Sequence, residues 1–356
     1  MSSAERARGR RRFPLEVRAA RTPDAPALLW RAGTSAPTAS LTYTELEQRT
    51  RLAALGLLAH GIASGERVAL LIAPGPAYPV ALLALLRAGC VAVPLSTRVP
   101  ADAIPALLGR VGCRRLITGE GTAAFATAGI EVMDPAVFRR SKEQAQTPST
   151  PLSQRGEEND ELRQEGSNDD SPCTGENELP PFDPDAPATI VFTSGSTGIP
   201  KAALHSFASH WASAVGANRN LPLRPGDRWL LSLPLWHVGG LAVIFRCIQG
   251  GAAVAIPGRD EPLAETIRAL GVTHLSLVAT QLRRLLADAR GRGALRSLKG
   301  VLLGGGPLPA PLLDEAAAAG ARLVTSYGST ETSSQATATR PDDPPAALRT
   351  AGRPLP

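Results

Sequence analysis

Short apolar runs alternate with segments of helical spacing in the first third of the chain. Residues 67–72, 90–94 and 115–118 are apolar runs of the length expected for buried strands. Between them, residues 79–87 and 105–111 repeat apolar side chains at helical spacing and predict helices. Strands that alternate with helices in this way predict a parallel sheet with helices on both faces.

A strand and a longer helix are predicted before this sheet. Residues 23–30 contain the strand candidate, and residues 46–58 repeat leucine at helical spacing. Thr42 or Thr44 fits the N-cap of this helix, because a hydroxyl there can accept a hydrogen bond from a free backbone N–H. We expect the helix to end at Gly61.

The same alternation resumes after residue 181. Directly after residue 201, a helical pattern begins at Ala202 and continues to about Val215, carrying His205 and His210. We therefore expect a second unit, and an α/β fold with two doubly wound, mostly parallel sheets flanked by helices. The predicted strands of this half span residues 188–192, 229–234, 252–256, 272–278, 300–303 and 322–325.

Two polar stretches interrupt the apolar pattern. Residues 139–181 are polar and acidic with almost no large apolar side chains, so they cannot bury enough surface to offset the entropy cost of ordering. We expect a disordered insert there and a disordered basic leader at residues 1–12, although an arginine cluster can also contact nucleic acid or anionic lipid. The ordered chain then divides into a first α/β subdomain at residues 13–138 and a second at residues 182–356.

Composition narrows the class of protein. The chain has 356 residues, 43% of them hydrophobic and 20% charged, with a net charge of +6. No run approaches the ~18 apolar residues of a membrane span. The four cysteines have neither a metal-ligand spacing nor a disulfide framework. We expect a globular cytoplasmic protein with no nucleic-acid partner and no membrane span.

Residues 193–201 read Thr-Ser-Gly-Ser-Thr-Gly-Ile-Pro-Lys and follow a predicted strand. Glycines let the backbone approach a ligand, while hydroxyl and turning N–H groups bind anionic oxygens. The pattern predicts a phosphate loop, and a plain surface turn is the alternative. A Walker A loop is excluded because proline precedes the lysine and alanine follows it. The phosphate-binding candidates are Thr193, Ser194, Gly195, Ser196, Thr197, Gly198 and Lys201.

Two later loops, each after a predicted strand, carry complementary groups. Tyr327 can stack on an adenine ring, Thr330 can bond an α-phosphate, and Glu331 can hold Mg²⁺ through hard oxygen ligands. A triple glycine before Pro307 lets a flat group lie against the backbone, although alone it is a weak signal. The adenine-binding candidates are Gly304, Gly305, Gly306, Ser326, Tyr327 and Gly328.

His237 lies between a predicted strand end and a pair of glycines. A single histidine is more often structural than catalytic. In an open α/β sheet, however, ligands bind beyond the carboxyl ends of the strands. This position therefore favours a functional role for His237.

These loops together resemble those of the adenylate-forming enzymes, which include the acyl-CoA synthetases. The resemblance covers nearly the whole ordered chain and implies the large N-terminal domain of that superfamily. Within it, residues 233–240, 303–309 and 326–335 most resemble the 2-succinylbenzoate–CoA ligases of menaquinone and phylloquinone synthesis. The resemblance implies ATP and CoA as substrates and Mg²⁺ as the metal ion.

The resemblance also assigns roles to individual residues. It implies catalytic roles for Lys201, Thr330, Glu331 and His237, and an acyl-binding site formed by His237, Arg246 and Ser329. The substrate 2-succinylbenzoate is a dianion, so Arg246 can hold one carboxylate while the other reacts. The alternative is that Arg246 is a solvated helix arginine.

The superfamily continues with a small C-terminal domain, which we expect to be missing from this chain. An acid–thiol ligase completed by a separate chain is one hypothesis, and a non-catalytic nucleotide-binding remnant is another. A different AMP-forming acyl-CoA synthetase is the alternative within the enzyme class. A second copy of the chain is left open as a partner.

Overall fold

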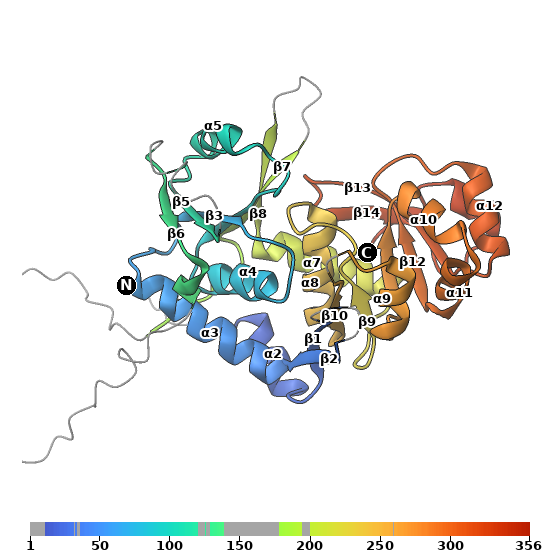
Figure 1. Ribbon diagram of the computed structural model, residues 1–356, viewed down its shortest axis with the longest axis horizontal. Helices are drawn as coiled ribbons and strands as arrows, with labels where there is room; N and C mark the ends of the chain where they lie inside the picture. Colours follow the sequence, from blue (N-terminus) through green and yellow to red (C-terminus); the bar gives the residue numbers. More distant parts are fainter. Residues whose placement is uncertain are drawn as a thin grey trace, which may run out of the picture.

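In the computed structural model, the described residues are 11–31, 33, 36–119, 125, 129–138, 178–193, 200–258 and 260–356. They form two sheets that lie side by side with helices packed around them (Figure 1). The first sheet has six strands in the order β6-β5-β3-β4-β7-β8, and all its pairs are parallel except β7–β8. Its strands are β3 Arg67–Leu71, β4 Val91–Pro94, β5 Arg115–Thr118, β6 Glu131–Met133, β7 Pro187–Thr193 and β8 Lys201–Ser206.

The second sheet has nine strands in the order β15-β14-β13-β12-β11-β9-β10-β1-β2. Its central pairs are parallel, while the β1–β2 pair and the β13–β14–β15 pairs at the two ends are antiparallel. The prediction of an α/β fold with two mostly parallel sheets is confirmed. The strands are β1 Pro26–Arg31, β2 Thr38–Thr42, β9 Arg228–Leu230, β10 Ala253–Ile256, β11 His274–Leu277, β12 Gly300–Leu303, β13 Leu323–Ser329, β14 Ser334–Ala338 and β15 Arg353–Pro354.

The two halves of the chain exchange strands. β1 and β2 come from the first half, yet β1 pairs with β10 in the second sheet. β7 and β8 come from the second half, yet β7 pairs with β4 in the first sheet. The sheets therefore do not follow the division expected at residues 139–181. The predicted disordered segments lie largely on residues 1–10 and 139–177, which are outside the described residues.

The helix predicted from Ala202 is wrong at its start. Residues 201–206 form β8, which pairs antiparallel with β7 and places Ala202 opposite Phe192. The edge of β7 needs backbone partners, and residues 201–206 supply them as strand β8. Helix α7 (Phe207–Asn220) begins one residue after β8, where the Ser206 hydroxyl accepts a hydrogen bond from the Ser209 N–H at 3.2 Å. His205 is therefore a strand residue, whereas His210 lies on α7.

Helices α7 and α8 (Val238–Gly250) lie between the two sheets, as Figure 1 shows. A single buried cluster joins Tyr78 of the first sheet's helices to Phe207 and Phe245 of α7 and α8, so both halves share this core. Edge-to-face rings of Phe13, Phe182 and Phe207 add to it. The other helices are α2 Pro14–Arg21, α3 Tyr43–Ala59, α4 Ala77–Arg87, α5 Ile104–Arg110, α9 Leu263–Ala269, α10 Ala279–Leu286, α11 Ala289–Ser297 and α12 Ala310–Ala318.

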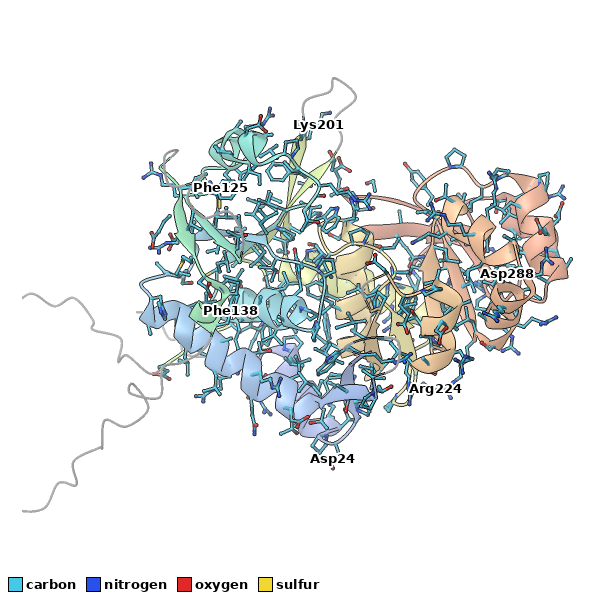
Figure 2. The ribbon with its side chains drawn as sticks, in the orientation of Figure 1. Asp24, Phe125, Phe138, Lys201, Arg224 and Asp288 are labelled. Carbon is cyan, nitrogen blue, oxygen red and sulfur yellow. The ribbon has the colours of Figure 1, made fainter. Side chains whose placement is uncertain are left out.

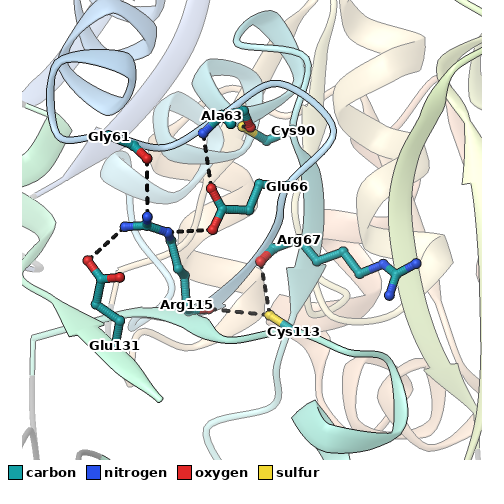
Figure 3. Close-up of polar contacts among 8 residues, drawn as sticks. All are labelled: Gly61, Ala63, Glu66, Arg67, Cys90, Cys113, Arg115 and Glu131. Atoms are coloured by element: carbon teal, nitrogen blue, oxygen red, sulfur yellow. Dashed lines mark hydrogen bonds and ion pairs between the residues drawn. The ribbon is translucent and has the colours of Figure 1, made fainter. Parts of the chain in front are cut away.

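The cysteines of the first sheet are buried thiols. Arg115 ties the start of β5 to Glu66 and Glu131, and the nearby Cys113 Sγ bonds the carbonyl oxygens of Arg67 and Arg115 (Figure 3). Burial raises the pKa of Cys90 to about 12 and that of Cys113 to about 11. Both side chains therefore stay protonated and serve packing.

No helix in the described part of the chain is long and apolar enough to cross a membrane.

Candidate active site

A pocket of about 390 Å³ opens beyond the carboxyl ends of β11, β12 and β13. The start of α8 (Val238–Gly250) and the loop before it close the opposite side. In parallel sheets this is the edge where ligands bind. The pocket is lined by Leu233, Pro234, His237, Val238, Gly239, Arg246, Ser276, Leu277, Val278, Leu302, Gly304, Gly305, Ser326, Gly328, Ser329, Thr330, Ser334 and Gln335.

Glycines allow the walls of this pocket to approach one another. A Cβ atom on Gly240 would lie 2.2 Å from the Pro234 carbonyl oxygen, so only glycine lets α8 start against that loop. A Cβ atom on Gly304 would lie 2.8 Å from Oγ of Ser326, whose hydroxyl donates to the Leu303 carbonyl at 3.0 Å. The ends of β12 and β13 are thereby held side by side.

Arg246 lies at the buried side of the pocket, with 1% of its surface exposed. Its Nη2 donates to Oε1 of Gln335 at 2.7 Å and to Oγ of Ser334 at 3.3 Å. Its guanidinium carbon lies 5.3 Å from the centroid of the Trp229 ring, a cation–π contact. The interpretation of Arg246 as a solvated helix arginine is wrong, because α8 is buried along nearly its whole length.

The charge of Arg246 is not balanced by a carboxylate. Its Nε has no hydrogen-bond partner, and among the described residues its side chain forms no ion pair. Burial lowers the pKa of Arg246 to about 10, so the side chain remains charged near neutral pH. A buried, unpaired cation is costly, and an anion bound in the pocket would offset that cost.

His237 lies at the rim of the pocket, as the N-cap residue of α8. Burial, followed by the nearby charge of Arg98, lowers the pKa of His237. The imidazole is therefore neutral near pH 7 and can accept or donate a hydrogen bond there.

The turn between β13 and β14 forms the other rim. Thr332 holds it, because its Oγ1 accepts from the Ser329 N–H at 3.0 Å. Ser333 takes a left-handed φ of 57°, and its N–H donates to the Thr330 carbonyl at 3.0 Å. Tyr327, 62% exposed, leaves its ring free on the surface of β13.

Lys201 and Glu331 come from different sheets, and the charge of Lys201 acts on the Glu331 carboxyl. Hydrogen bonds with its own backbone and with Ser329 lower the pKa of the Glu331 carboxyl, and the positive charge of Lys201 lowers it further. Glu331 is therefore an exposed carboxylate that can accept a cation. Lys201 opens β8 opposite Thr193 of β7, and Figure 2 labels it at that edge of the first sheet. In the described part of the chain, no three His, Cys, Asp or Glu side chains gather into a metal cluster.

The structure brings eight of the eighteen predicted site residues into one pocket. His237, Arg246, Gly304, Gly305, Ser326, Gly328, Ser329 and Thr330 all line the pocket, while Gly306 and Tyr327 lie beside it without lining it. The phosphate-loop candidates Ser194, Gly195, Ser196, Thr197 and Gly198 lie outside the described residues.

Sequence reasoning did not select Ser334 and Gln335 as site residues. Both hold Arg246 from β14. It also missed Ser276, Leu277 and Val278, which line the pocket at the end of β11. The sequence signal that points to such partners is the arginine within an apolar helix, because a buried arginine needs polar partners elsewhere in the fold.

Comparison with known proteins identifies the family of the chain. A family model described as AMP-binding enzyme matches residues 15–356. The chain belongs to the AMP-binding enzyme family. The 2-succinylbenzoate–CoA ligase of Salmonella typhimurium is 33% identical over 302 residues, which are 85% of this chain and 56% of that protein.

Solved structures show the same fold. O-succinylbenzoate Coenzyme A synthetase from Bacillus subtilis, in complex with AMP, aligns with a TM-score of 0.78 and 28% identity over 97% of this chain and 81% of that chain. The same enzyme in complex with ATP and magnesium ion gives a TM-score of 0.75 over 96% of this chain and 65% of that chain, at 28% identity. The chain spans 56% of the length of the curated Salmonella relative.

Proposed function

We propose that this chain carries the adenylating site of an ATP-dependent acid–thiol ligase that activates 2-succinylbenzoate. The observation that carries the proposal is the buried and unneutralised charge of Arg246 in a pocket bounded by Ser329 and Thr330. A substrate with two carboxylates fits this arrangement. Arg246 would bind one of them, and the other would lie at the β13–β14 turn, where nucleotide chemistry is expected.

The residues at the rim suit ATP and Mg²⁺. The exposed ring of Tyr327 can stack on adenine, and the Glu331 carboxylate offers the hard oxygen ligand that Mg²⁺ prefers. The positive charge of Lys201 acts on Glu331, and Lys201 would contact a phosphate bound at this rim. When bound, the metal ion would neutralise negative charge on the phosphates. The Bacillus subtilis relative has been solved with ATP and magnesium ion, which supports this reading.

In the proposed reaction, an oxygen of the free carboxylate attacks the α-phosphorus of ATP. The bond between the α-phosphorus and its bridging oxygen breaks, and pyrophosphate leaves, with Lys201 and Thr330 stabilising the charge that develops. The thiolate of CoA then attacks the acyl carbon and displaces AMP. His237, neutral at the pocket rim, would orient the acyl group by a hydrogen bond.

Two other functions share parts of this site. Another AMP-forming acyl-CoA synthetase would keep the nucleotide residues but would not need a buried cation in the acyl pocket. A non-catalytic nucleotide-binding protein would keep the nucleotide residues and lack turnover.

We further propose a cytoplasmic location, which the unpaired buried thiols Cys90, Cys113 and Cys247 support.

The test is pyrophosphate release by the purified chain with 2-succinylbenzoate and a panel of aryl and fatty acids. Each acid is assayed with and without the C-terminal domain of a longer relative, added as a separate polypeptide. We expect release with 2-succinylbenzoate and thioester formation when CoA is also present. Release with a different acid alone would reject the substrate, and nucleotide binding without release under either condition would favour the non-catalytic function.

A further inference from the structure

A chain of buried polar side chains connects the antiparallel β7–β8 strand pair with the β13–β14 turn. Thr189 on β7 is paired with His205 on β8, and His210 lies one turn into α7. At most 4% of the surface of each of these side chains is exposed. Nothing in the proposed reaction uses them, so their polar contacts need a separate explanation.

The contacts form a continuous line from His210 to Thr330. Nε2 of His210 lies 2.7 Å from Oγ1 of Thr189, and Oγ1 of Thr189 lies 3.5 Å from Nδ1 of His205. At the far end, Nε2 of His205 lies 2.6 Å from the carbonyl oxygen of Thr330. The imidazole of His210 also stacks on Phe245, with ring centroids 4.7 Å apart.

These contacts assign the protons. A carbonyl oxygen only accepts, so Nε2 of His205 must carry a hydrogen and donate to Thr330. In a neutral ring, Nδ1 of His205 is then the acceptor for the Thr189 hydroxyl. That leaves Oγ1 of Thr189 free to accept from Nε2–H of His210. Nδ1 of His210, which has no partner, is then an unprotonated lone pair, and no N–H donor is left unpaired.

The carbonyl of Thr330 is where this chain meets the candidate site. It accepts both the Ser333 N–H, which closes the turn, and the His205 N–H, which comes from the other sheet. His205 lies four residues after Lys201 on the same strand. Moving β8 would therefore move the lysine and the turn together.

We propose that His205 is a positioning residue that fixes the Thr330–Glu331 turn relative to Lys201 through its Nε2–H, so that both sides of the nucleotide site keep one geometry. The proposal rests on the nucleotide site described under the proposed function. It concerns the placement of groups that contact the nucleotide, because His205 itself is buried behind the turn. The acyl pocket depends instead on Arg246, which reaches β14 through Ser334 and Gln335.

The test compares two amides that differ by one methylene group. In His205→Gln, the side-chain amide can reach the place of Nε2 and donate to Thr330. In His205→Asn, the amide reaches only the place of Nδ1, next to Thr189. His205→Phe keeps the shape of the ring without either nitrogen. The affinities of the 356-residue chain and its variants for ATP with Mg²⁺, and for 2-succinylbenzoate, are measured by calorimetry, and thermal unfolding is followed in parallel.

We expect His205→Asn and His205→Phe to bind ATP about five- to tenfold more weakly, the loss of one buried hydrogen bond, and His205→Gln to stay within about twofold of wild type. Binding of 2-succinylbenzoate should change by less than about twofold in all three. Ring ¹⁵N chemical shifts of the chain's five histidines should place His205 in the Nε2–H tautomer.

Each contrary result has a distinct meaning. Wild-type affinity in all three variants would overturn the positioning role and leave the proposed function standing. Equal losses of ATP affinity in His205→Gln and His205→Asn would also overturn it. A general packing defect would then explain the weaker binding without the hydrogen bond from Nε2. A wild-type chain that binds no nucleotide would overturn both proposals. A Nδ1–H tautomer at His205 would overturn the positioning role independently of any ligand.

Discussion

At the scale of single residues, burial decides what Arg246 can do. The sequence places it within an apolar helix and leaves open whether it faces solvent or a substrate. No local pattern could resolve this, because the partners Ser334 and Gln335 lie almost ninety positions away along the chain. The places of His237 and Thr330 at the pocket were predictable, because each stands in a loop that follows a strand.

Replacing Arg246 with methionine should separate acyl binding from nucleotide binding. We expect Arg246→Met to weaken 2-succinylbenzoate binding about 100-fold, because a charge-assisted hydrogen bond in a buried site is lost, while ATP affinity stays near wild type. The thermal midpoint should hold or rise, since a buried unpaired charge has been removed. Calorimetry measures the affinities, with Arg283→Met on the exposed face of α10 as the control. Undiminished acid binding in Arg246→Met would exclude Arg246 from the acyl site.

Acid should destabilise the fold through His210. Burial, with a smaller contribution from His205, lowers the pKa of His210 to about 3, whereas an unfolded histidine titrates near pH ~6.5. Between these values the unfolded state binds more protons, so the free energy of unfolding falls as the pH drops, by about 2 kcal/mol at pH 5 for this one group. His210→Phe, which can still stack on Phe245, should show a flatter decline. Urea unfolding from pH 7 to pH 5 measures both slopes, and equal slopes would contradict the assignment.

At the scale of elements, the helix caps were easier to predict than the hairpins. Thr42 caps α3 as expected, and Glu45 completes a capping box with it. The wrong helix start at Ala202 has a different origin, because small apolar residues fit both a strand and a helix. What selected the strand was the neighbouring edge of β7, which lies eight or more residues back along the chain.

The β13–β14 hairpin should depend on Gly328. A Cβ atom there would lie 1.8 Å from the carbonyl oxygen of Ser334, at the register shift between Tyr327 and Gly328. We expect Gly328→Ala to lower the free energy of unfolding by about 2–4 kcal/mol and to abolish measurable ATP binding, because the two strands must separate. Gly306→Ala, with no atom within 4 Å of its Cβ, is the matched control for stability. Thermal unfolding and calorimetry give the comparison, and wild-type stability in Gly328→Ala would contradict it.

At the scale of the whole molecule, the exchange of strands could not be predicted. The alternation of strands and helices indicates that parallel sheets form, but it does not indicate which sheet a short strand such as β1 joins. That choice depends on packing between segments far apart in sequence. β1 lies beside β10 because Leu28 and its neighbours complete a core shared by both halves.

Because the two halves exchange strands, we expect them to stay associated when the backbone is cut between them. If residues within 139–177 are replaced by a protease recognition site and cleaved, β1 remains paired with β10 and β7 with β4. Separating the fragments would expose the core around Tyr78, Phe207 and Phe245. This exposure costs a free energy of about 25 cal/mol per Å² of apolar surface. We therefore expect the fragments to co-elute in size-exclusion chromatography and to unfold in one transition, as the uncut chain does. Elution as two independently folded fragments would mean that each sheet has a sufficient core of its own, and that the shared core is not what joins the two halves.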